Sequence, residues 1–150
     1  MDIMQTAHML NFDTTVTGVT ALPNDPEGYA PTAGSDVVVV TSGMPRKPGM
    51  SREDLIGVNA KIVKSVVDQA LKYSPNAYFI IISNPMDAMT FLTLKDTKLP
   101  RNRILGQGGM LDSSRFRYFL AQALTKAGYP ATPADVDGMV IGGHSDKTMV

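Results

Sequence analysis

Residues 36–43 read DVVVVTSG, and this stretch decides the fold because four consecutive valines run into a Ser-Gly turn signal. A short run that is apolar at every position is typical of a strand in a parallel sheet with both faces covered. Residues 77–83, AYFIIIS, form a second run of the same kind, which stops at Asn84-Pro85. The two runs predict neighbouring strands of a parallel sheet in an α/β protein.

A helix is predicted between these two strands. Apolar residues recur there at spacings of three and four, namely Leu55, Val58, Ile62, Val66, Ala70 and Leu71. Ser51, with Asp54 three residues later, predicts a capping box at the start of the helix. Two parallel strands joined by a helix favour a right-handed crossover.

The remainder of the chain carries weaker structural signals. They predict a short helix over 87–96, a strand over 103–105, a helix over 112–127 that ends at Gly128-Tyr129-Pro130, and a capped helix start over 132–135. The apolar segments 14–19 and 136–144 predict further strands, and the turn-rich segment 22–34 predicts a mobile surface loop.

Composition narrows the classes of function. The 150 residues carry 14 Lys+Arg and 14 Asp+Glu, and this balance argues against binding to nucleic acid or to an anionic membrane surface. The absence of cysteine excludes disulfides, thiolate zinc sites and Cys nucleophiles. No apolar stretch reaches the ~20 residues of a membrane-spanning helix, and the first residues lack the basic flank and apolar core of a signal peptide. We therefore expect a soluble, cytoplasmic domain.

A cationic loop follows the first valine-rich strand. Residues 43–52, GMPRKPGMSR, hold three cations, two prolines and two glycines. The simpler interpretation is a solvated basic loop, and the functional one is an anion-binding lid, because guanidinium groups pair with carboxylates and phosphates. The loop leaves the carboxyl end of a buried strand, where ligands bind in α/β sheets, and this favours the lid.

Several polar residues stand at other predicted strand or helix ends. Asn84 is either a turn former or a ligand contact, and the bond to Pro85 is a candidate for a cis peptide. Asp112 and Arg115 share one helix face, where the simpler interpretation is a capping acid and an exposed cation. His144 follows two glycines at the end of an apolar run, a plausible functional position, whereas His8 is predicted to be an ordinary surface or half-buried residue.

Four motifs give the chain a family resemblance. They are TSGMPRKPGMSREDL at 41–55, IISNPMDAMT at 81–90, LDSSRFRYFL at 111–120 and IGGHSD at 141–146. In this order they resemble malate dehydrogenases, specifically the branch whose sequences are close to lactate dehydrogenases. The resemblance extends over nearly the whole chain.

The resemblance implies a partial Rossmann fold, a doubly wound parallel sheet with the start of an α+β substrate domain. In the strand order 3-2-1-4-5-6 the chain would supply strands 3 to 6, with strands 1 and 2 absent. Residues 1–112 would form part of the NAD-binding domain, and residues 113–150 the beginning of the substrate and catalytic domain. The family also implies a homodimer or homotetramer at full length, with no nucleic acid, membrane or metal as a partner.

The implied reaction is hydride transfer between C2 of malate and NAD, giving oxaloacetate, and its reverse. His144 resembles the family's general acid and base, with Asp112 orienting the ring. Arg46 would bind the C4 carboxylate, Arg52 the C2 oxygen and Arg115 the C1 carboxylate. Lactate dehydrogenases usually have Gln at the position of Arg46, so charge complementarity favours malate over lactate.

The resemblance also assigns a cofactor-binding set. Asn59, Ile82, Ser83 and Asn84 match positions that touch NAD in the family, and Asn84 matches a substrate contact as well. NAD is thus the expected cofactor, and a small dicarboxylate, malate or oxaloacetate, the expected substrate.

The chain departs from the family pattern in ways that bear on activity. No GxGxxG follows an N-terminal strand, and the chain stops at Val150, so we expect a product truncated at both ends that is inactive by itself. Ser145 stands where the family has Gly after the histidine. A non-catalytic fragment or remnant is the competing interpretation, and lactate or another 2-hydroxy acid is the alternative substrate.

Overall fold

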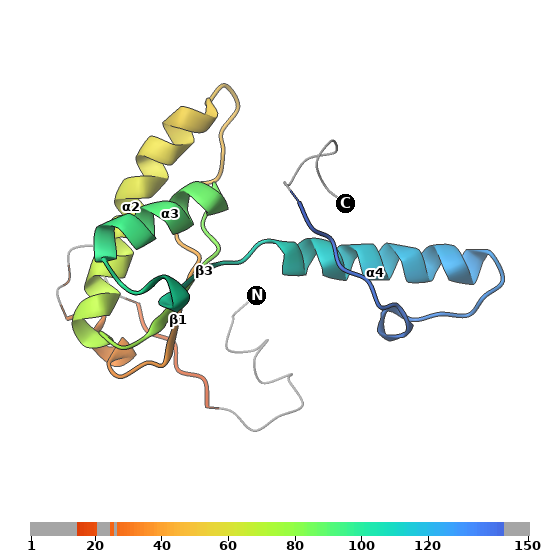
Figure 1. The fold of residues 1–150 in the computed structure, drawn as a ribbon, viewed down its shortest axis with the longest axis horizontal. Helices are drawn as coiled ribbons and strands as arrows, with labels where there is room; N and C mark the ends of the chain where they lie inside the picture. The colour runs from red at the N-terminus through yellow and green to blue at the C-terminus, as the bar shows by residue number, and fades with distance from the viewer. Residues whose placement is uncertain (1–14, 21–24, 26, 143–150) are drawn as a thin grey trace.

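The computed structural model describes residues 15–20, 25 and 27–142, and Figure 1 shows a sheet-and-helix body from which a long helix extends. The elements follow the order η1 (Ala30–Thr32), β1 (Val37–Val40), α2 (Arg52–Tyr73), β2 (Tyr78–Ile81), α3 (Met86–Thr97), η2 (Arg101–Arg103), β3 (Ile104–Gly106), α4 (Gly109–Lys126) and η3 (Pro133–Asp135). No helix in the described part of the chain is long and apolar enough to span a membrane.

The sheet confirms the predicted parallel arrangement. Its three strands lie in the order β1-β2-β3, and both pairings are parallel. Val40 is aligned with Ile81, and Ile81 with Gly106, so the strands end at the same level. Each of the first two strands is shorter than the apolar run that predicted it, and the last residues of each run form the carboxyl edge of the sheet.

Helix α2 begins as its sequence predicts. Ser51 is the N-cap, its hydroxyl accepts a hydrogen bond from the Asp54 amide at 3.0 Å, and the Asp54 carboxylate accepts one from the Ser51 amide at 3.0 Å. The capping box satisfies two backbone N–H groups that a helix start otherwise leaves open. The start of α2 is therefore fixed locally, whatever packs around it.

The capping box predicts a pH-dependent contribution to stability. Hydrogen bonds from the Ser51 hydroxyl and amide hold the pKa of the Asp54 carboxyl below its usual value. Since the folded-state pKa is depressed, this stabilisation is present at neutral pH and is lost as the pH falls through that pKa. We expect the gap in thermal unfolding midpoint between the unmodified chain and Asp54→Ala to shrink between pH 7 and pH 3.

Circular dichroism melts over this pH range provide the measurement. Ser51→Ala is the matched control, since it removes the hydroxyl that lowers the pKa of Asp54. The unfolding midpoint of this variant should therefore depend less on pH than that of the unmodified chain. A gap that stays constant from pH 7 to pH 3 would contradict the assignment.

The core lies between the sheet and one layer of helices. Phe79 and Ile81 of β2, Val63 of α2 and Met89 of α3 are fully buried in it. The Lys64 ammonium group of α2 links the two helices at the surface, 2.6 Å from the Asp96 carboxylate of α3. Burial of this apolar layer is the main force that holds α2 and α3 on the sheet.

The prediction that both faces of the sheet are covered is wrong for the described residues. Alternate side chains of a strand point to opposite faces, and only the Val38 and Val40 side of β1 meets the helices. Val37 and Val39, on the other side, are 50% and 52% exposed. A run of four valines shows that each position is apolar, but it does not show what lies above each face.

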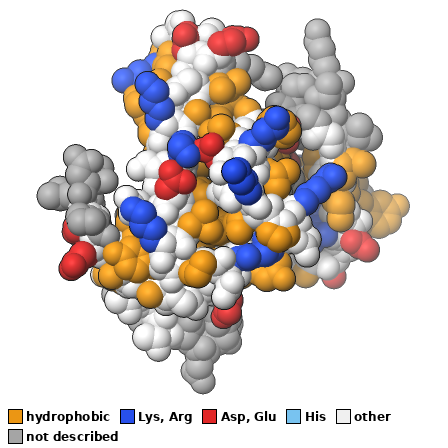
Figure 2. All heavy atoms as spheres, turned by 60° about the vertical axis from the view of Figure 1, so that its left-hand side comes forward, with side chains coloured by type: hydrophobic (Ala, Val, Ile, Leu, Met, Phe, Trp, Pro, Cys, Tyr) orange, Lys and Arg blue, Asp and Glu red, His pale blue; other side chains and the backbone are white. Residues whose placement is uncertain are grey.

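Figure 2 shows the surface of the body, where hydrophobic side chains lie among Lys and Arg side chains with fewer Asp and Glu. Phe91 of α3 is one of the exposed large apolar residues, and the Lys95 ammonium lies 5.3 Å from the centre of its ring. Individually exposed apolar side chains are ordinary on a protein surface.

Helix α4 and the chain that follows it form a second unit (Figure 1). Gly128, with φ of +90°, ends the helix as predicted, and the chain then runs back along it. The Arg117 side chain donates from Nε to the Gly138 carbonyl at 2.8 Å, and the Val140 amide donates to Ser113 Oγ at 3.0 Å. Residues 136–141 of the predicted strand over 136–144 are therefore irregular, because their backbone pairs with helix side chains.

Two other expectations can be compared with the fold. Residues 15–20, most of the predicted strand over 14–19, are irregular and do not join the sheet. In the predicted strand order two strands separate this segment from β1, and the described residues supply neither. Within the predicted loop over 22–34, Tyr29 packs against the core. Residue 112 lies in the first turn of α4, and a domain division there stays a prediction.

Candidate active site at the carboxyl edge of the sheet

The three strands end together, and residues 41–44, 82–85 and 107–108 that follow them are named here the carboxyl edge. The Ile82 amide donates to the Val40 carbonyl at 2.9 Å, and the Gln107 amide donates to the Ile81 carbonyl at 2.9 Å. These bonds continue the ladder one step past each strand. In α/β sheets ligands bind in the crevice outside this end.

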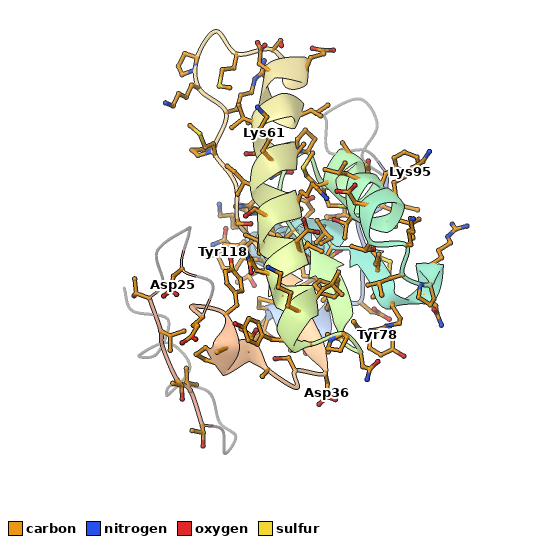
Figure 3. All side chains as sticks on the ribbon, turned by 90° about the vertical axis from the view of Figure 1, so that its left-hand side faces the viewer. Asp25, Asp36, Lys61, Tyr78, Lys95 and Tyr118 are labelled. Atoms are coloured by element: carbon orange, nitrogen blue, oxygen red, sulfur yellow. The ribbon has the colours of Figure 1, made fainter. Side chains whose placement is uncertain are left out.

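Helix α2 begins at the carboxyl edge and runs back toward the amino ends of the strands. In Figure 3, Asp36 and Tyr78, at the amino ends of β1 and β2, lie at one end of the molecule, with Lys61 toward the other. The amino-terminal half of α2 therefore lies near the carboxyl edge. This orientation places the loop 43–51, which enters α2, at the same edge.

Asn59 connects two segments of the carboxyl edge. Its side chain is 1% exposed, its Oδ1 accepts from the Met44 amide at 2.7 Å, and its Nδ2 donates to the Met44 carbonyl at 3.2 Å. The same Nδ2 donates to the Asn84 carbonyl at 2.6 Å. Both N–H donors of the amide are thus used. The prediction that Asn59 touches NAD stays a prediction.

Ser83 makes a second connection within the edge. Its hydroxyl is buried and donates to the Ser42 carbonyl at 2.5 Å, so the end of β2 is tied to the end of β1. The Ser42 hydroxyl oxygen is buried and has no hydrogen-bond partner within the described ranges. Reasoning from sequence missed the contact of the Ser83 hydroxyl with the Ser42 carbonyl as a link between strand ends. The Ser-rich ends of the two apolar runs are the signal that points to it.

The turn after β2 has the predicted cis bond between Asn84 and Pro85. Asn84 is exposed at the carboxyl edge, while Ile82 is half-buried beside it. Helix α3 begins at Met86, directly after the turn. The Asn84 side chain therefore stands at the start of a twelve-residue helix, where N–H groups carry a partial positive charge.

The cationic loop, residues 43–52, contains Met44, whose backbone is hydrogen-bonded to the Asn59 side chain. Arg46 is exposed, and its Nε donates to the Met50 carbonyl at 3.1 Å across the loop. Among the described residues its remaining guanidinium N–H groups have no partner, so they are available to an anion. Arg52 is the first residue of α2, and its side chain lies outside the described part.

The acid and cation predicted on α4 lie in one helical turn. The Arg115 Nη1 atom is 3.9 Å from the Asp112 carboxylate, and the two side chains are 59% and 15% exposed. Asp112 makes a further interaction as well. His144, the predicted proton carrier, lies outside the described residues, as does His8.

The structure thus brings together part of the predicted set. Contacts connect Asn59 and Ser83 to residues 42–44 and 84, and Arg46 stands two residues beyond this junction. Asp112 and Arg115 follow β3 on α4, where they contact one another, and the Arg46 side chain bonds within its own loop. Across those ranges, no group of three or more His, Cys, Asp and Glu side chains is placed to hold a metal ion.

Comparison with known proteins identifies related chains. Residues 2–106 match the family described as lactate/malate dehydrogenase, NAD binding domain. Across all 150 residues the chain is 65% identical to a malate dehydrogenase of Bacteroides thetaiotaomicron and 59% identical to one of Flavobacterium johnsoniae. It spans 44% and 45% of the length of those two proteins.

Solved structures agree with the sequence comparison. The malate dehydrogenase of Picrophilus torridus in its apo form matches with a TM-score of 0.72 and 47% identity, over 83% of this chain and 37% of that one. The lactate dehydrogenase of Cryptosporidium parvum, complexed with lactic acid and nicotinamide adenine dinucleotide, matches with a TM-score of 0.67 and 43% identity. That match covers 80% of this chain and 36% of the other.

Proposed function

This chain belongs to the lactate/malate dehydrogenase family, and on that premise we propose that it forms part of an NAD-dependent malate dehydrogenase. The proposed reaction moves a hydride between C2 of malate and the nicotinamide ring, and it moves the hydroxyl proton to or from the protein. The malate dehydrogenases that are 59–65% identical over the whole chain support this choice.

One observation carries the proposal. The cationic loop and the Asn84 turn leave neighbouring strands at the carboxyl edge, and the buried Asn59 amide joins the two segments directly. A loop that carries a cation and a turn that carries an amide, joined at the carboxyl ends of parallel strands, suit a small carboxylate ligand. The hydrogen bonds of Asn59 hold the loop and the turn together in the absence of a ligand.

The residues at this edge also fit a dinucleotide. Ile82 is half-buried and Asn84 is exposed, so both stand at the surface of the crevice where nucleotides bind in doubly wound sheets. When bound, NAD supplies the hydride acceptor or donor. In the proposal, Ile82, Ser83 and Asn84 position it, and Asn59 supports them.

The chain's own residues carry the proton and the charges. His144 takes the C2 hydroxyl proton on an imidazole nitrogen as malate is oxidised, and returns it in the reverse direction. Asp112 orients that ring and stabilises its protonated form. Arg115 binds the C1 carboxylate, Arg52 stabilises the charge that develops on the C2 oxygen, and Arg46 binds the C4 carboxylate.

A second candidate is a lactate dehydrogenase or another 2-hydroxy-acid dehydrogenase. The 43% identity to the lactate dehydrogenase of Cryptosporidium parvum favours it. Arg46 argues against it, because its cation would have no partner on the methyl group of lactate. A non-catalytic fragment of such an enzyme is the remaining alternative.

The test uses an extended enzyme, in which residues 1–150 replace the 65%-identical segment of the Bacteroides thetaiotaomicron malate dehydrogenase. NADH oxidation is measured with oxaloacetate and with pyruvate. A higher kcat/KM for oxaloacetate supports the proposal, and a higher value for pyruvate supports the lactate alternative. If the extended enzyme folds and binds NADH but turns over neither substrate, the result supports the alternative of a non-catalytic fragment.

The domain division and the assembly belong to the same proposal. Beyond its first turn, α4 contacts residues 133–142 rather than the sheet. This contact supports a domain boundary near residue 112. Exposed apolar side chains on α4, including Phe119 at 63%, support a homodimer or homotetramer of the extended enzyme. Light scattering on the extended enzyme measures its mass.

A further inference from the structure

The Asn59 side chain has a more specific arrangement than a cofactor contact requires. It is one of the few buried polar side chains of the described chain, and its three hydrogen bonds all go to backbone atoms of the carboxyl edge. Two of them clamp the amide and the carbonyl of Met44 together. A buried amide with this many backbone partners is costly to replace, because each lost bond leaves a part-buried backbone group without its partner.

Gly43 lies close to the side-chain amide of Asn59. A Cβ atom built on Gly43 would lie 3.2 Å from Asn59 Nδ2, and the backbone of Gly43 has φ of +152°. A larger residue would press on the amide and would strain the backbone as well. Glycine at position 43 therefore allows the chain to approach Asn59 closely.

The loop has a second anchor at its other end. Ser51 is held to Asp54 by the capping box, so the chain is fixed at Met44 on one side and at Ser51 on the other. Between these anchors lie residues 45–50, with Arg46 near the first anchor and Gly49 at φ of +84°. The clamp on Met44 thus sets the point from which the segment carrying Arg46 starts.

We propose that Asn59 is a positioning residue that holds the start of the Arg46 loop and the Asn84 turn at a fixed separation, so that both meet one substrate. It acts through Arg46 and Asn84 rather than through contact with the substrate. This inference rests on the proposed function for its kinetic consequence, although the tie itself is independent of any activity. Aspartate does not suit the position, because it cannot donate to the two carbonyl groups.

The tie is tested first in the 150-residue chain by amide hydrogen exchange at Met44, measured by NMR. In Asn59→Ala the Met44 amide loses its acceptor, and we expect its exchange to become at least about tenfold faster. Ser74→Ala is the matched control. Ser74 is a buried polar residue at the other end of α2, which donates to the Thr32 carbonyl and accepts from the Ser35 amide.

Equal acceleration at Met44 in Asn59→Ala and Ser74→Ala would overturn the tie, since it would show general loosening of the fold. If Asn59→Ala does not fold, Gly43→Ala provides a second variant, because it retains Asn59 but presses on its amide. It should accelerate exchange at Met44 as well. No effect of Gly43→Ala at this amide would count against the tie.

The positioning role is tested in the extended enzyme by a double-mutant cycle with Arg46→Gln. We expect Asn59→Ala to lower kcat/KM for oxaloacetate by about a hundredfold when Arg46 is present, because small misplacements of substrate-binding groups have effects of this size. In the Arg46→Gln background the further loss should be about tenfold smaller. The same fold-loss in both backgrounds would overturn the role. An inactive extended enzyme would refute the proposed function, and the exchange experiment would still decide the tie.

Discussion

Arg46→Gln in the extended enzyme is expected to lower kcat/KM for oxaloacetate by about a hundredfold and to leave pyruvate reduction within about threefold. Oxaloacetate carries a second carboxylate, and pyruvate has a methyl group in its place. A guanidinium–carboxylate pair that closes away from water strengthens as the local dielectric falls. Glutamine retains hydrogen-bonding groups but loses the charge, so the carboxylate would enter the site without a partner.

Steady-state kinetics with both substrates provide the measurement. Lys47→Gln is the matched control, because it removes one positive charge from the same loop at the adjacent residue. That variant should change the two substrates by similar, small factors. Equal losses on oxaloacetate and pyruvate in Arg46→Gln would remove Arg46 from substrate selection.

The 150-residue chain by itself is expected to bind NADH weakly or not at all and to show no measurable oxaloacetate reduction. Dinucleotide binding in this fold draws on a GxGxxG turn that presents a helix N-terminus to the pyrophosphate, and the 150 residues contain no such motif. Arg46 is also exposed, so water screens its attraction for a carboxylate. The predicted catalytic and substrate-binding residues are thus present without the motif that orients the cofactor in this fold.

Two measurements on the purified chain check this expectation: a titration that follows NADH fluorescence and an oxaloacetate assay at high protein concentration. The extended enzyme under the same conditions is the positive control. Micromolar binding with turnover by the 150-residue chain would show that these residues contain a dinucleotide site of their own.

Local sequence patterns were sufficient to locate the three α-helices of the described chain, although α4 begins at Gly109 rather than at the predicted residue 112. Ser51 and Asp54 specify the start of α2 through contacts three residues apart, and Gly128 ends α4 through a backbone conformation that suits glycine. The runs 36–43 and 77–83 produced neighbouring parallel strands because β-branched and apolar side chains suit a buried sheet. The cis bond at Asn84-Pro85 was also anticipated from its dipeptide.

Local patterns were insufficient for the segments whose structure depends on distant partners. The apolar residues 136–141 suggested a strand, but Arg117 and Ser113, more than twenty residues earlier, take up hydrogen bonds that a strand needs from a neighbour. The valines of β1 suggested two covered faces, and the described chain covers one. Periodicity reports the polarity of a position, not the element that packs on it.

The sequence by itself determined the three α-helices and the two apolar strands of the described chain, the family and the residue types expected at the carboxyl edge. Only the tertiary structure showed how that edge is held together. Asn59 lies fifteen residues from Met44 and twenty-five from Asn84, and its amide reaches both because the first turns of α2 lie beside the carboxyl edge. An interior asparagine of a helix has no local pattern that distinguishes it from a surface one, since its role depends on backbone groups that only the folded chain brings within hydrogen-bond distance.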